Sequence, residues 1–382
     1  MADSVLLDGP PLPEFKGRPG WEFTDLSGLD FAAYDAAPAA EGGSPVLEVP
    51  GRETDPDGAV VLSLADAREL HPDVVDRYLG TVVSSDDPFV ARNDAAWEGG
   101  LFVWVPRGAQ VAAPIARDVA VAPGTAVSHR TLIVLEEGAK AEVWEQYLGT
   151  GDGDALLNAV TEIVVGPNAT LRYVGAQGLS EQAWIFGTQR AVVDRDGELD
   201  WAALGFGSAR GKVRMETQLR GPGASAKVTG AYAGHARQHL DFDTTQEHAA
   251  PNTTSDLAFR GVLNGRATAV WRGMIRVDPG AQQTDAFQES RNLLLSKRAH
   301  ADAIPGLEIE ANDVRCTHAA AIAQVDKEQV FYLMSRGLRR DQATRLVIDG
   351  FLQALVERFP AGPVHDAVSA ALERRLETVL GV

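Results

Sequence analysis

The feature that most constrains the fold is a tight turn that recurs between short segments of alternating apolar and polar residues. No amphipathic helix intervenes, so the chain must reverse direction in little space at each turn. The turn dipeptides are Gly108-Ala109, Gly138-Ala139, Asn168-Ala169, Gly197-Glu198, Gly223-Ala224, Gly265-Arg266 and Gly280-Ala281. The first three follow one another at intervals of 30 residues, and the later intervals are irregular. This repetition favours a coiled sheet, a β-helix, over the alternative of a globular β-sandwich.

The periodicity divides the chain into three regions. The first part of residues 1–95 is rich in proline and glycine, which suits a loosely ordered lead-in. The rest of this region is expected to form short helices. Residues 96–312 have the near-two period of strands and are expected to form the β-helix core. Residues 313–382 hold one more strand and then a helical domain. We therefore predict a mainly β fold with small α-helical regions at both ends.

Start and stop signals place the terminal helices. In the N-terminal region Ser63 is a candidate cap, Pro72 opens a second helix, and Asp86-Asp87-Pro88 breaks the chain before a third. In the C-terminal region Asp326 and Gln329 resemble a capping box, and Gly337 ends that helix. Asp341 is expected to cap a longer helix with the apolar stripe Leu346, Val347, Phe351, Leu355 and Phe359. A last helix after Pro363 carries Val364, Val368, Ala371, Leu372, Leu376 and Val379.

The charge balance limits the partners. Acidic residues outnumber basic ones by 53 to 35, the net charge is -18, and no basic tract interrupts this balance. Such a surface repels phosphate backbones and anionic membranes, which argues against a nucleic-acid or membrane partner. The start of the chain lacks the cationic region of a signal peptide, and no stretch approaches the roughly 20 apolar residues of a spanning helix. We expect a cytoplasmic protein.

The only cysteine, Cys316, precedes His318 by two positions. In an extended strand the thiol and the imidazole project from one face, so they could bind the same ion. Thiolate and imidazole are usual donors for zinc, iron and iron–sulfur clusters, but a tetrahedral centre needs four ligands. Any metal here must therefore be completed by a cofactor, by another part of the chain or by another polypeptide. The alternative is a buried apolar cysteine beside a hydrogen-bonded histidine.

A second polar cluster surrounds one predicted strand. His239, Asp241 and Asp243 share a strand face, with His235, Glu247 and His248 nearby. Such a set could bind a divalent metal or act as acid and base. The alternative is a polar strand face whose hydrogen bonds are satisfied within the protein.

The glycine-rich stretch at residues 205–213, GFGSARGKV, does not fit a phosphate-binding loop. Phe206 stands where the first glycine is required, and Val213 replaces the hydroxyl that would hold magnesium. We interpret the stretch as a turn and expect no nucleotide site in this chain.

The sequence from about residue 230 to residue 360 closely resembles the SufB/SufD family of iron–sulfur cluster assembly proteins. The residues that carry the resemblance are Pro305-Gly306-Leu307-Glu308-Ile309, Asp313-Val314, Cys316-Thr317-His318 and the run from Gln329 to Leu338. The Cys-x-His sequence and the scarcity of cysteine are similar to the SufD type, whereas the SufB type places His-Glu there and has more thiols. Ala319 departs from the glycine common in the SufD type, so the local backbone is expected to differ.

The resemblance implies a right-handed β-helix between helical ends, in a scaffold complex with a SufB-type subunit and the SufC ATPase. It implies a non-enzymatic scaffold subunit and an iron–sulfur cluster that is transient and shared with SufB. His318 would be a ligand at the SufB seam, with Cys316 as a second donor or a sulfur-relay residue. The C-terminal helices would dock SufC, and the residues expected there are Phe331, Tyr332, Arg336, Gly337 and Phe351. Independently of the resemblance, an open flank of the β-helix would allow two copies of this chain to pair when SufB is absent.

Two other functions remain open from the sequence. A SufB-type main scaffold would need a thiol on another strand, and this chain has none. A carbohydrate-acting β-helix enzyme would use Asp241, Asp243 and Glu247 as acid and base.

Overall fold

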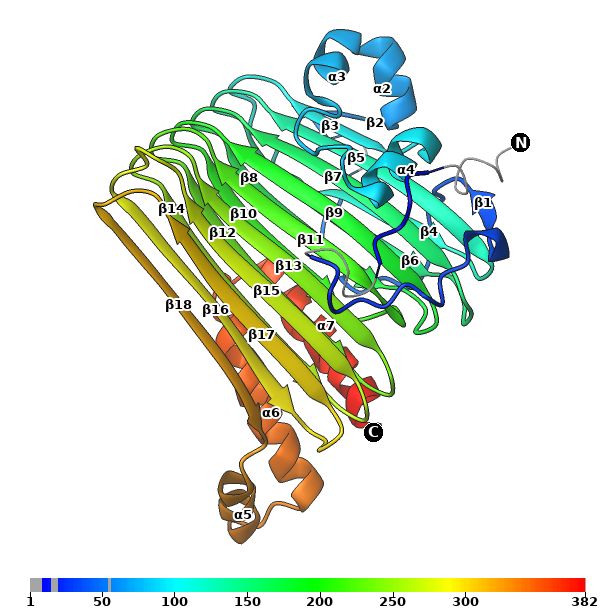
Figure 1. Ribbon diagram of the computed structural model, residues 1–382, viewed down its shortest axis with the longest axis vertical. Helices are drawn as coiled ribbons and strands as arrows, with labels where there is room; N and C mark the ends of the chain where they lie inside the picture. The colour runs from blue at the N-terminus through cyan, green and yellow to red at the C-terminus, as the bar shows by residue number, and fades with distance from the viewer. Residues whose placement is uncertain (1–8, 15–19, 54–55, 382) are drawn as a thin grey trace.

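The computed structural model describes residues 9–14, 20–53 and 56–381 and confirms a β-helix core (Figure 1). The chain winds through about eight turns, and each turn gives one strand to each of two facing sheets. From β3 to β18, odd-numbered strands make one sheet and even-numbered strands the other, and each strand up to β16 pairs in parallel with the strand two ahead of it. The N-terminal strand β2 extends the odd-numbered sheet by pairing antiparallel with β3. The strands are β3 Leu101–Val105, β4 Ile115–Val121, β5 Thr125–Leu135, β6 Lys140–Gly149, β7 Leu156–Val165, β8 Thr170–Gly178, β9 Trp184–Val193, β10 Glu198–Gly205, β11 Arg210–Leu219, β12 Ser225–Gly234, β13 His239–His248, β14 Thr254–Leu263, β15 Thr268–Val277, β16 Thr284–Leu294, β17 His300–Ile309 and β18 Val314–Gln324.

The recurring turns are corners of the solenoid, where an odd-numbered strand passes to the next even-numbered one. Each corner has a residue with a left-handed backbone, namely Gly108, Gly138, Asn168, Asp196, Gly223, Asn252 and Gly280, with φ between 54° and 86°. The corners also hydrogen-bond to one another along the stack, as from Gly138 N to Pro167 O (2.8 Å) and from Asn168 N to Arg195 O (2.9 Å). A left-handed residue at the same place in each turn lets these backbones stack.

Two of the turn positions expected from the sequence belong elsewhere. Gly265 lies at the opposite corner, between β14 and β15, together with left-handed Ser208 and Ala236 in earlier turns. Gly197 is one residue beyond the left-handed position, which Asp196 occupies. The irregular intervals therefore came from mixing two corners and from missing Asp196 and Asn252, because aspartate and asparagine also tolerate this conformation.

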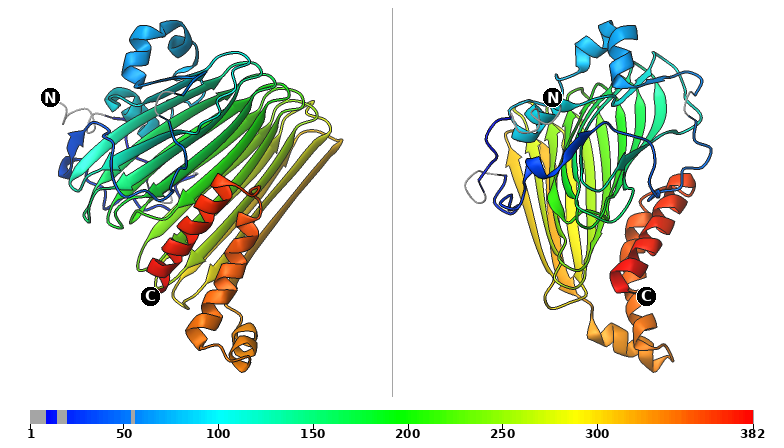
Figure 2. Two further views of the ribbon diagram at one scale, coloured as in Figure 1. Left: turned by 180° about the vertical axis from the view of Figure 1, so that it is seen from behind. Right: turned by 90° about the vertical axis from the view of Figure 1, so that its right-hand side faces the viewer.

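The N-terminal region packs along one end and one flank of the solenoid (Figure 2). Its elements are a short 3-10 helix η1 Phe31–Ala33, β1 Asp35–Ala37, β2 Val60–Leu62, α2 Leu64–Leu70, α3 Pro72–Tyr78 and α4 Pro88–Ala96. Ser63 caps α2, Pro72 opens α3, and a third helix follows Asp86-Asp87-Pro88, as the sequence indicated. The structure adds that Asp87 is the N-cap of α4. In the described part of the lead-in, Trp21 and Leu47 are almost fully buried against the strands. That part is a packed strap rather than a loose tail, and the remaining lead-in residues, 1–8 and 15–19, lie outside the description.

Three helices follow the last strand: α5 Lys327–Ser335, α6 Arg340–Val356 and α7 Pro363–Leu380. Helices α6 and α7 lie on the outer face of the even-numbered sheet, while α5 projects beyond the solenoid (Figures 1 and 2). The apolar face expected for α7 is buried as predicted. None of the helices in the described part of the chain combines the length and apolar composition needed to cross a bilayer.

The sequence interpretation of α6 was wrong in two details. Arg339, not Asp341, is the N-cap, and Asp341 lies in the first turn. Leu355 and Phe359 of the expected stripe are buried, but Leu346 is 51% exposed. The buried face of the helix is Ala343, Ile348, Leu352, Leu355 and Val356. The helix carries apolar residues on two adjacent faces, and the face that fits against the outer side chains of the even-numbered sheet is the one that is buried.

Candidate functional site

The last turn of the solenoid, formed by β17 and β18, is open. Strand β17 pairs only with β15 and β18 only with β16, so one edge of each has no strand partner within the described ranges (Figure 1). Apolar side chains on this turn remain exposed, at Ile304, Leu307, Ile309 and Ile322. An unpaired edge with exposed apolar side chains is a surface suited to pairing with another chain. We call this surface the open rim.

Cys316 and His318 lie on the open rim and share a face of β18, as the alternation predicted. Cys316 is in register with Ala286 and His318 with Gln288, and both partners are buried inside the solenoid. In-register side chains of parallel strands point to the same side of the sheet, so Cys316 and His318 face the interior at the last turn, which no further strand of the described residues covers. Cys316 is half-buried and packs against a small cluster around Ile275 and Ala281, whereas His318 is exposed.

Cys316 and His318 alone could supply only two ligands to a metal ion. Among the described residues no group of three or more histidine, cysteine or acidic side chains is placed to hold a metal ion. Burial raises the pKa of the Cys316 thiol, and the Asp285 carboxylate raises it further, so at neutral pH this sulfur carries its proton. A protonated thiol is a poor nucleophile and a poor ligand. The exposed imidazole of His318 is thus the more available donor in the free chain.

The polar cluster around His239, Asp241 and Asp243 is part of a network of ion pairs on the outer face of the odd-numbered sheet. Asp241 accepts hydrogen bonds from the Lys212 Nζ (2.9 Å) and the Thr24 hydroxyl (2.6 Å), and all three residues are buried. Asp243 lies 3.5 Å from the Lys212 amine and 3.9 Å from the Arg272 guanidinium. These pairings engage the carboxylates and support the structural interpretation rather than an acid–base site.

The histidines of that cluster are dispersed. His239 is on the same face, where burial lowers the pKa of its imidazole, and its Nδ1 lies 2.8 Å from the Thr268 hydroxyl. His248 points into the solenoid, between the hydroxyls of Thr253 (2.8 Å) and Ser255 (2.9 Å). His235 lies in the preceding turn against Glu181, at 2.7 Å.

The glycine-rich stretch is the turn between β10 and β11, as expected. Ser208 holds its left-handed position with φ 67° and is fully buried. The lysine of the stretch, Lys212, is buried and engaged with Asp241.

Four of the five residues expected to dock a partner lie on or beside the projecting helix α5. Phe331 is 72% and Tyr332 is 56% exposed, the Arg336 guanidinium stacks 5.1 Å from the Tyr332 ring, and Gly337 turns the chain with φ 99°. Phe351 differs, because its ring lies under the Arg260 guanidinium (5.0 Å) and its carbonyl accepts an Arg260 hydrogen bond (2.9 Å).

A hollow of about 570 Å³ lies at the base of α5. It runs between the end of β16, the end of β18 and the start of α6. Its walls include the apolar residues Leu294, Val330, Phe331 and Met334, and its basic residues are Lys297, Lys327 and Arg340. This hollow has no signature in the sequence, because its walls come from segments that are distant along the chain.

Comparison with known proteins agrees with these features. A family model described as "SUF system FeS cluster assembly, SufBD core domain" matches residues 119–351, and one described as "SufBD protein N-terminal region" matches residues 48–116. The iron-sulfur cluster assembly protein SufD of Bacillus subtilis is 31% identical over 325 residues, which cover 84% of this chain and 74% of the relative. An iron-sulfur cluster assembly SufBD family protein of Staphylococcus saprophyticus is 28% identical over 313 residues, covering 81% and 67%.

Proposed function

The chain belongs to the SufBD family of iron–sulfur cluster assembly proteins, and from that premise we propose that it is the SufD-type subunit of a scaffold formed with a SufB-type subunit and a SufC ATPase. The observation that carries the proposal is the position of His318 and Cys316 on the open rim. Two donors at an exposed edge are useful only when another chain supplies the rest.

The open rim is the proposed seam with the SufB-type subunit. A partner that lays its own strands against β17 and β18 would satisfy their free backbone groups and cover Leu307, Ile309 and Ile322. The same step would bring the partner's side chains over the interior face of β18, where His318 points. Without such a partner, a second copy of this chain can use the same rim.

Iron and sulfur are the cargo of this seam. His318 would supply an imidazole nitrogen to the growing cluster, and Cys316 would act as a second donor or a relay once its proton is lost to a base from the partner. The cluster would be transient and shared with the SufB-type subunit. The chain itself acts as a scaffold and hydrolyses no nucleotide, and a cytoplasmic location is part of the proposal.

The projecting helix α5 is the proposed SufC docking element. Phe331 and Tyr332 offer apolar surface, and the hollow beside them is edged by Lys297, Lys327 and Arg340 on a chain of net charge -18. A SufC surface with apolar anchors and acidic neighbours would fit this hollow.

Helix α5 is connected almost directly to the strand that bears His318. Strand β18 ends at Gln324 and α5 begins at Lys327, so only Val325 and Asp326 separate them. A shift of α5 on ATP binding by SufC would pull on an edge strand that is held on one side only. Such a pull would open or close the seam around the two donors.

The proposal is tested by co-expression with the SufB-type and SufC partners, followed by measurement of iron and acid-labile sulfide per purified complex. We expect His318→Ala to leave the complex intact and to lower its cluster content severalfold. Thr317→Ala is the matched control, because Thr317 is also exposed on β18 but faces outward. Normal cluster content in an intact His318→Ala complex would refute the role of His318.

The enzyme alternative is less well supported. Asp241 and Asp243 pair with Lys212 and Arg272, and Glu247 lies 3.2 Å from the Arg190 guanidinium. Carboxylates held in this way are not placed to exchange protons with a sugar substrate.

A further inference from the structure

Strand β17, at the open rim, has charges of opposite sign at its two ends. Lys297 and Arg298 stand in the turn just before its first residue, whereas Glu308 lies near its end and Glu310 just beyond it. All four side chains are exposed, and no ion pair among the described residues includes any of them. The rim therefore has a basic end, at Lys297 and Arg298, and an acidic end, at Glu308 and Glu310.

The other charges of the last turn do not cancel this polarity. Asp302 lies 3.2 Å from the His300 imidazole, and the Arg315 guanidinium lies 3.5 Å from the Asp285 carboxylate of the turn below. Asp313, which is exposed just before β18, adds a carboxylate to the acidic end.

Helix α5 and the start of α6 lie beside the basic end and contribute no net charge to it. Lys327 and Arg340 border the hollow there, and Asp326 and Glu328 flank Lys327, so these four charges sum to zero. The sign of the basic end is therefore set by the two cations of the turn before β17.

Two copies of the chain can place their rims face to face in two symmetric ways. A two-fold axis across the strands makes the facing strands antiparallel, so the basic end of each rim meets the acidic end of the other. A two-fold axis along the strands makes them parallel, so acidic ends meet each other and basic ends meet each other. Every contact occurs twice by symmetry, so the antiparallel arrangement joins opposite charges at both ends and the parallel one opposes like charges at both.

We propose that the open rim is an interface for a second copy of this chain, docked with its strands antiparallel, and that the charges at the two ends of β17 select this orientation. The exposed apolar side chains of the rim provide the buried area, and the charges exclude the parallel alternative by repulsion. The inference rests on the proposed use of the rim as a seam, which it deepens by giving the orientation of the occupant. A SufB-type subunit that replaces the second copy must then present acidic groups to Lys297 and Arg298.

The opposite end of the solenoid is covered, so the complement of one rim is the rim of another copy. Strand β2 pairs antiparallel with β3, and residues of the N-terminal region bridge to β4, from Ala40 to Ala120 and from Glu53 to Ile115. Helices α2 and α3 lie beyond the same end (Figure 1). Rim-to-rim pairing therefore closes after two chains and does not continue as a fibre.

The test compares two versions of the full-length chain that have the same net charge. The swapped variant, Lys297→Glu/Arg298→Glu/Glu308→Lys/Glu310→Lys, exchanges the basic and the acidic end. Sedimentation velocity of a copy labelled at its α-amino group with a fluorophore, mixed with increasing amounts of unlabelled chain under reducing conditions, measures the affinity of each combination.

We expect the wild type to pair with itself and the swapped variant to pair with itself at similar affinity. The wild type should pair with the swapped variant at least about tenfold more weakly, because both ends then oppose like charges. The difference between matched and mismatched pairs should shrink as salt is added, since salt screens exposed charges.

Lys140→Glu/Glu198→Lys is the matched control. Both residues are exposed and without an ion pair in the described part of the chain, but they lie on β6 and β10, away from the rim. This variant should pair with the wild type as tightly as the wild type pairs with itself.

Equal affinities in all three combinations of wild type and swapped variant would overturn the inference, and so would a wild type that stays monomeric. A mixed pair tighter than the matched pairs would indicate the parallel arrangement and would overturn it too. The smaller swap Arg298→Glu/Glu308→Lys repeats the comparison if the fourfold variant does not fold.

The sedimentation measurement uses the chain alone and does not depend on cluster assembly. If the charges decide the pairing but His318→Ala complexes keep their clusters, the ligand role fails and the orientation stands. If the clusters are lost in His318→Ala but the swapped variant pairs with the wild type as well as with itself, the orientation fails and the ligand role stands.

Discussion

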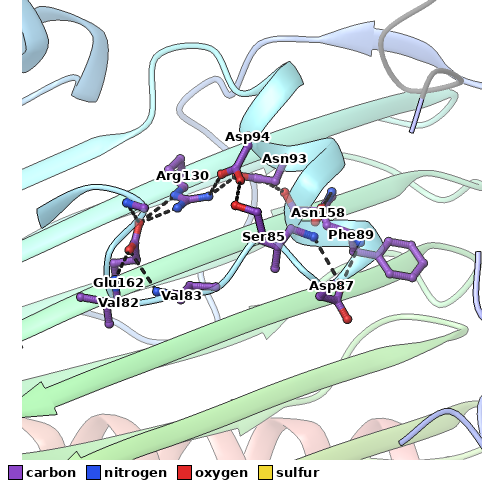
Figure 3. A network of polar contacts seen from close by, with 12 residues as sticks. Val82, Val83, Ser85, Asp87, Phe89, Asn93, Asp94, Arg130, Asn158 and Glu162 are labelled. Carbon is purple, nitrogen blue, oxygen red and sulfur yellow. Dashed lines mark hydrogen bonds and ion pairs between the residues drawn. The ribbon is translucent and has the colours of Figure 1, made fainter. Parts of the chain in front are cut away.

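The Arg130 guanidinium forms an ion pair with the Glu162 carboxylate, between strands β5 and β7, and both side chains are almost fully buried (Figure 3). The same carboxylate accepts backbone hydrogen bonds from Gly80 (2.9 Å), Val82 (3.0 Å) and Val83 (3.2 Å). Glu162 thus joins the solenoid to the loop between α3 and α4. Arg130 also pairs with Asp94 of α4, so this network holds the N-terminal region in place.

Removal of the carboxylate should weaken this attachment strongly. Glu162→Ala leaves the Nε and Nη2 of the buried Arg130 guanidinium and three backbone donors without their acceptor, while Nη1 keeps its pairing with Asp94. We expect a loss of about 3–5 kcal/mol in the free energy of unfolding. Urea denaturation would measure the loss in the free energy of unfolding. Limited proteolysis between α3 and α4 would show whether the N-terminal region is held less firmly. Glu137→Ala is the control, because its ion pair with Arg107 is solvent-exposed, and we expect it to cost less than about 1 kcal/mol. Equal losses in the two variants would contradict the role assigned to Glu162.

The buried imidazole of His248 should make the fold sensitive to acid. Burial lowers its pKa from 6.5 to about 4. Between these values the unfolded chain binds a proton that the folded chain does not, so stability is complete above pH 6.5 and falls as the pH drops toward 4. The full shift corresponds to about 3 kcal/mol.

His248→Gln isolates this contribution. The variant loses hydrogen bonds to Thr253 and Ser255 and should be less stable at neutral pH. Its deficit relative to the wild type should shrink between neutral pH and about pH 4.5, because it has no imidazole to protonate. Urea unfolding at a series of pH values gives both curves, and parallel curves would show that His248 is not the group responsible.

The exposed rings of α5 should dominate SufC docking. We expect Phe331→Ser to weaken SufC binding by about tenfold or more, since aromatic anchors in a hollow supply most of the energy of an interface. Leu70→Ser is the control, because Leu70 is 65% exposed on α2, in the N-terminal region. Isothermal titration calorimetry or surface plasmon resonance with purified SufC measures the affinity of each variant. A loss in Leu70→Ser that matched the loss in Phe331→Ser would place the contact elsewhere.

Phe351 was expected to belong to the same docking set, and the structure suggests a different effect for it. Its ring and carbonyl hold Arg260 of β14. Phe351→Ser should therefore lower the unfolding temperature of the chain more than Phe331→Ser does. If Phe351→Ser kept its thermal stability but lost affinity for SufC, Phe351 would belong to the docking surface after all.

The spacing of the turns favoured a β-helix over a β-sandwich because the β-helix repeats the same turn and strand in every rung. A left-handed corner residue followed by a strand of period two is visible in any single turn, as at Gly138 or Asn168. The sequence could not show which of two similar apolar faces of a helix becomes buried. The two apolar faces of α6, around Leu346 and around Ile348, are nearly equivalent in sequence, and only the shape of the sheet decides between them.

The candidate site was predicted in part for a similar reason. The alternation of Val314, Cys316 and His318 is enough to place the two donors on one face. The apolar pattern of β17, however, resembles that of the buried strands before it. Leu307 and Ile309 are exposed because, in the part of the chain that the structure describes, β17 belongs to the last turn.

The corner between β12 and β13 offers a way to stabilise the solenoid without touching the candidate site. Ala236 has φ 53°, a left-handed conformation that costs an L-residue other than asparagine or aspartate about 1–2 kcal/mol. Ala236→Gly removes this strain but adds flexibility to the unfolded chain worth about 0.5–1 kcal/mol, so we expect a net gain of about 0.5 kcal/mol. The reverse change at the next turn, Gly265→Ala, should destabilise the chain, because its φ is 64° and the new Cβ would lie 3.0 Å from the Ala236 nitrogen. Thermal unfolding of both variants and the wild type measures these two changes in stability. A destabilised Ala236→Gly would mean that the corner stores no strain at this position and that its shape is set by the stacked strands alone.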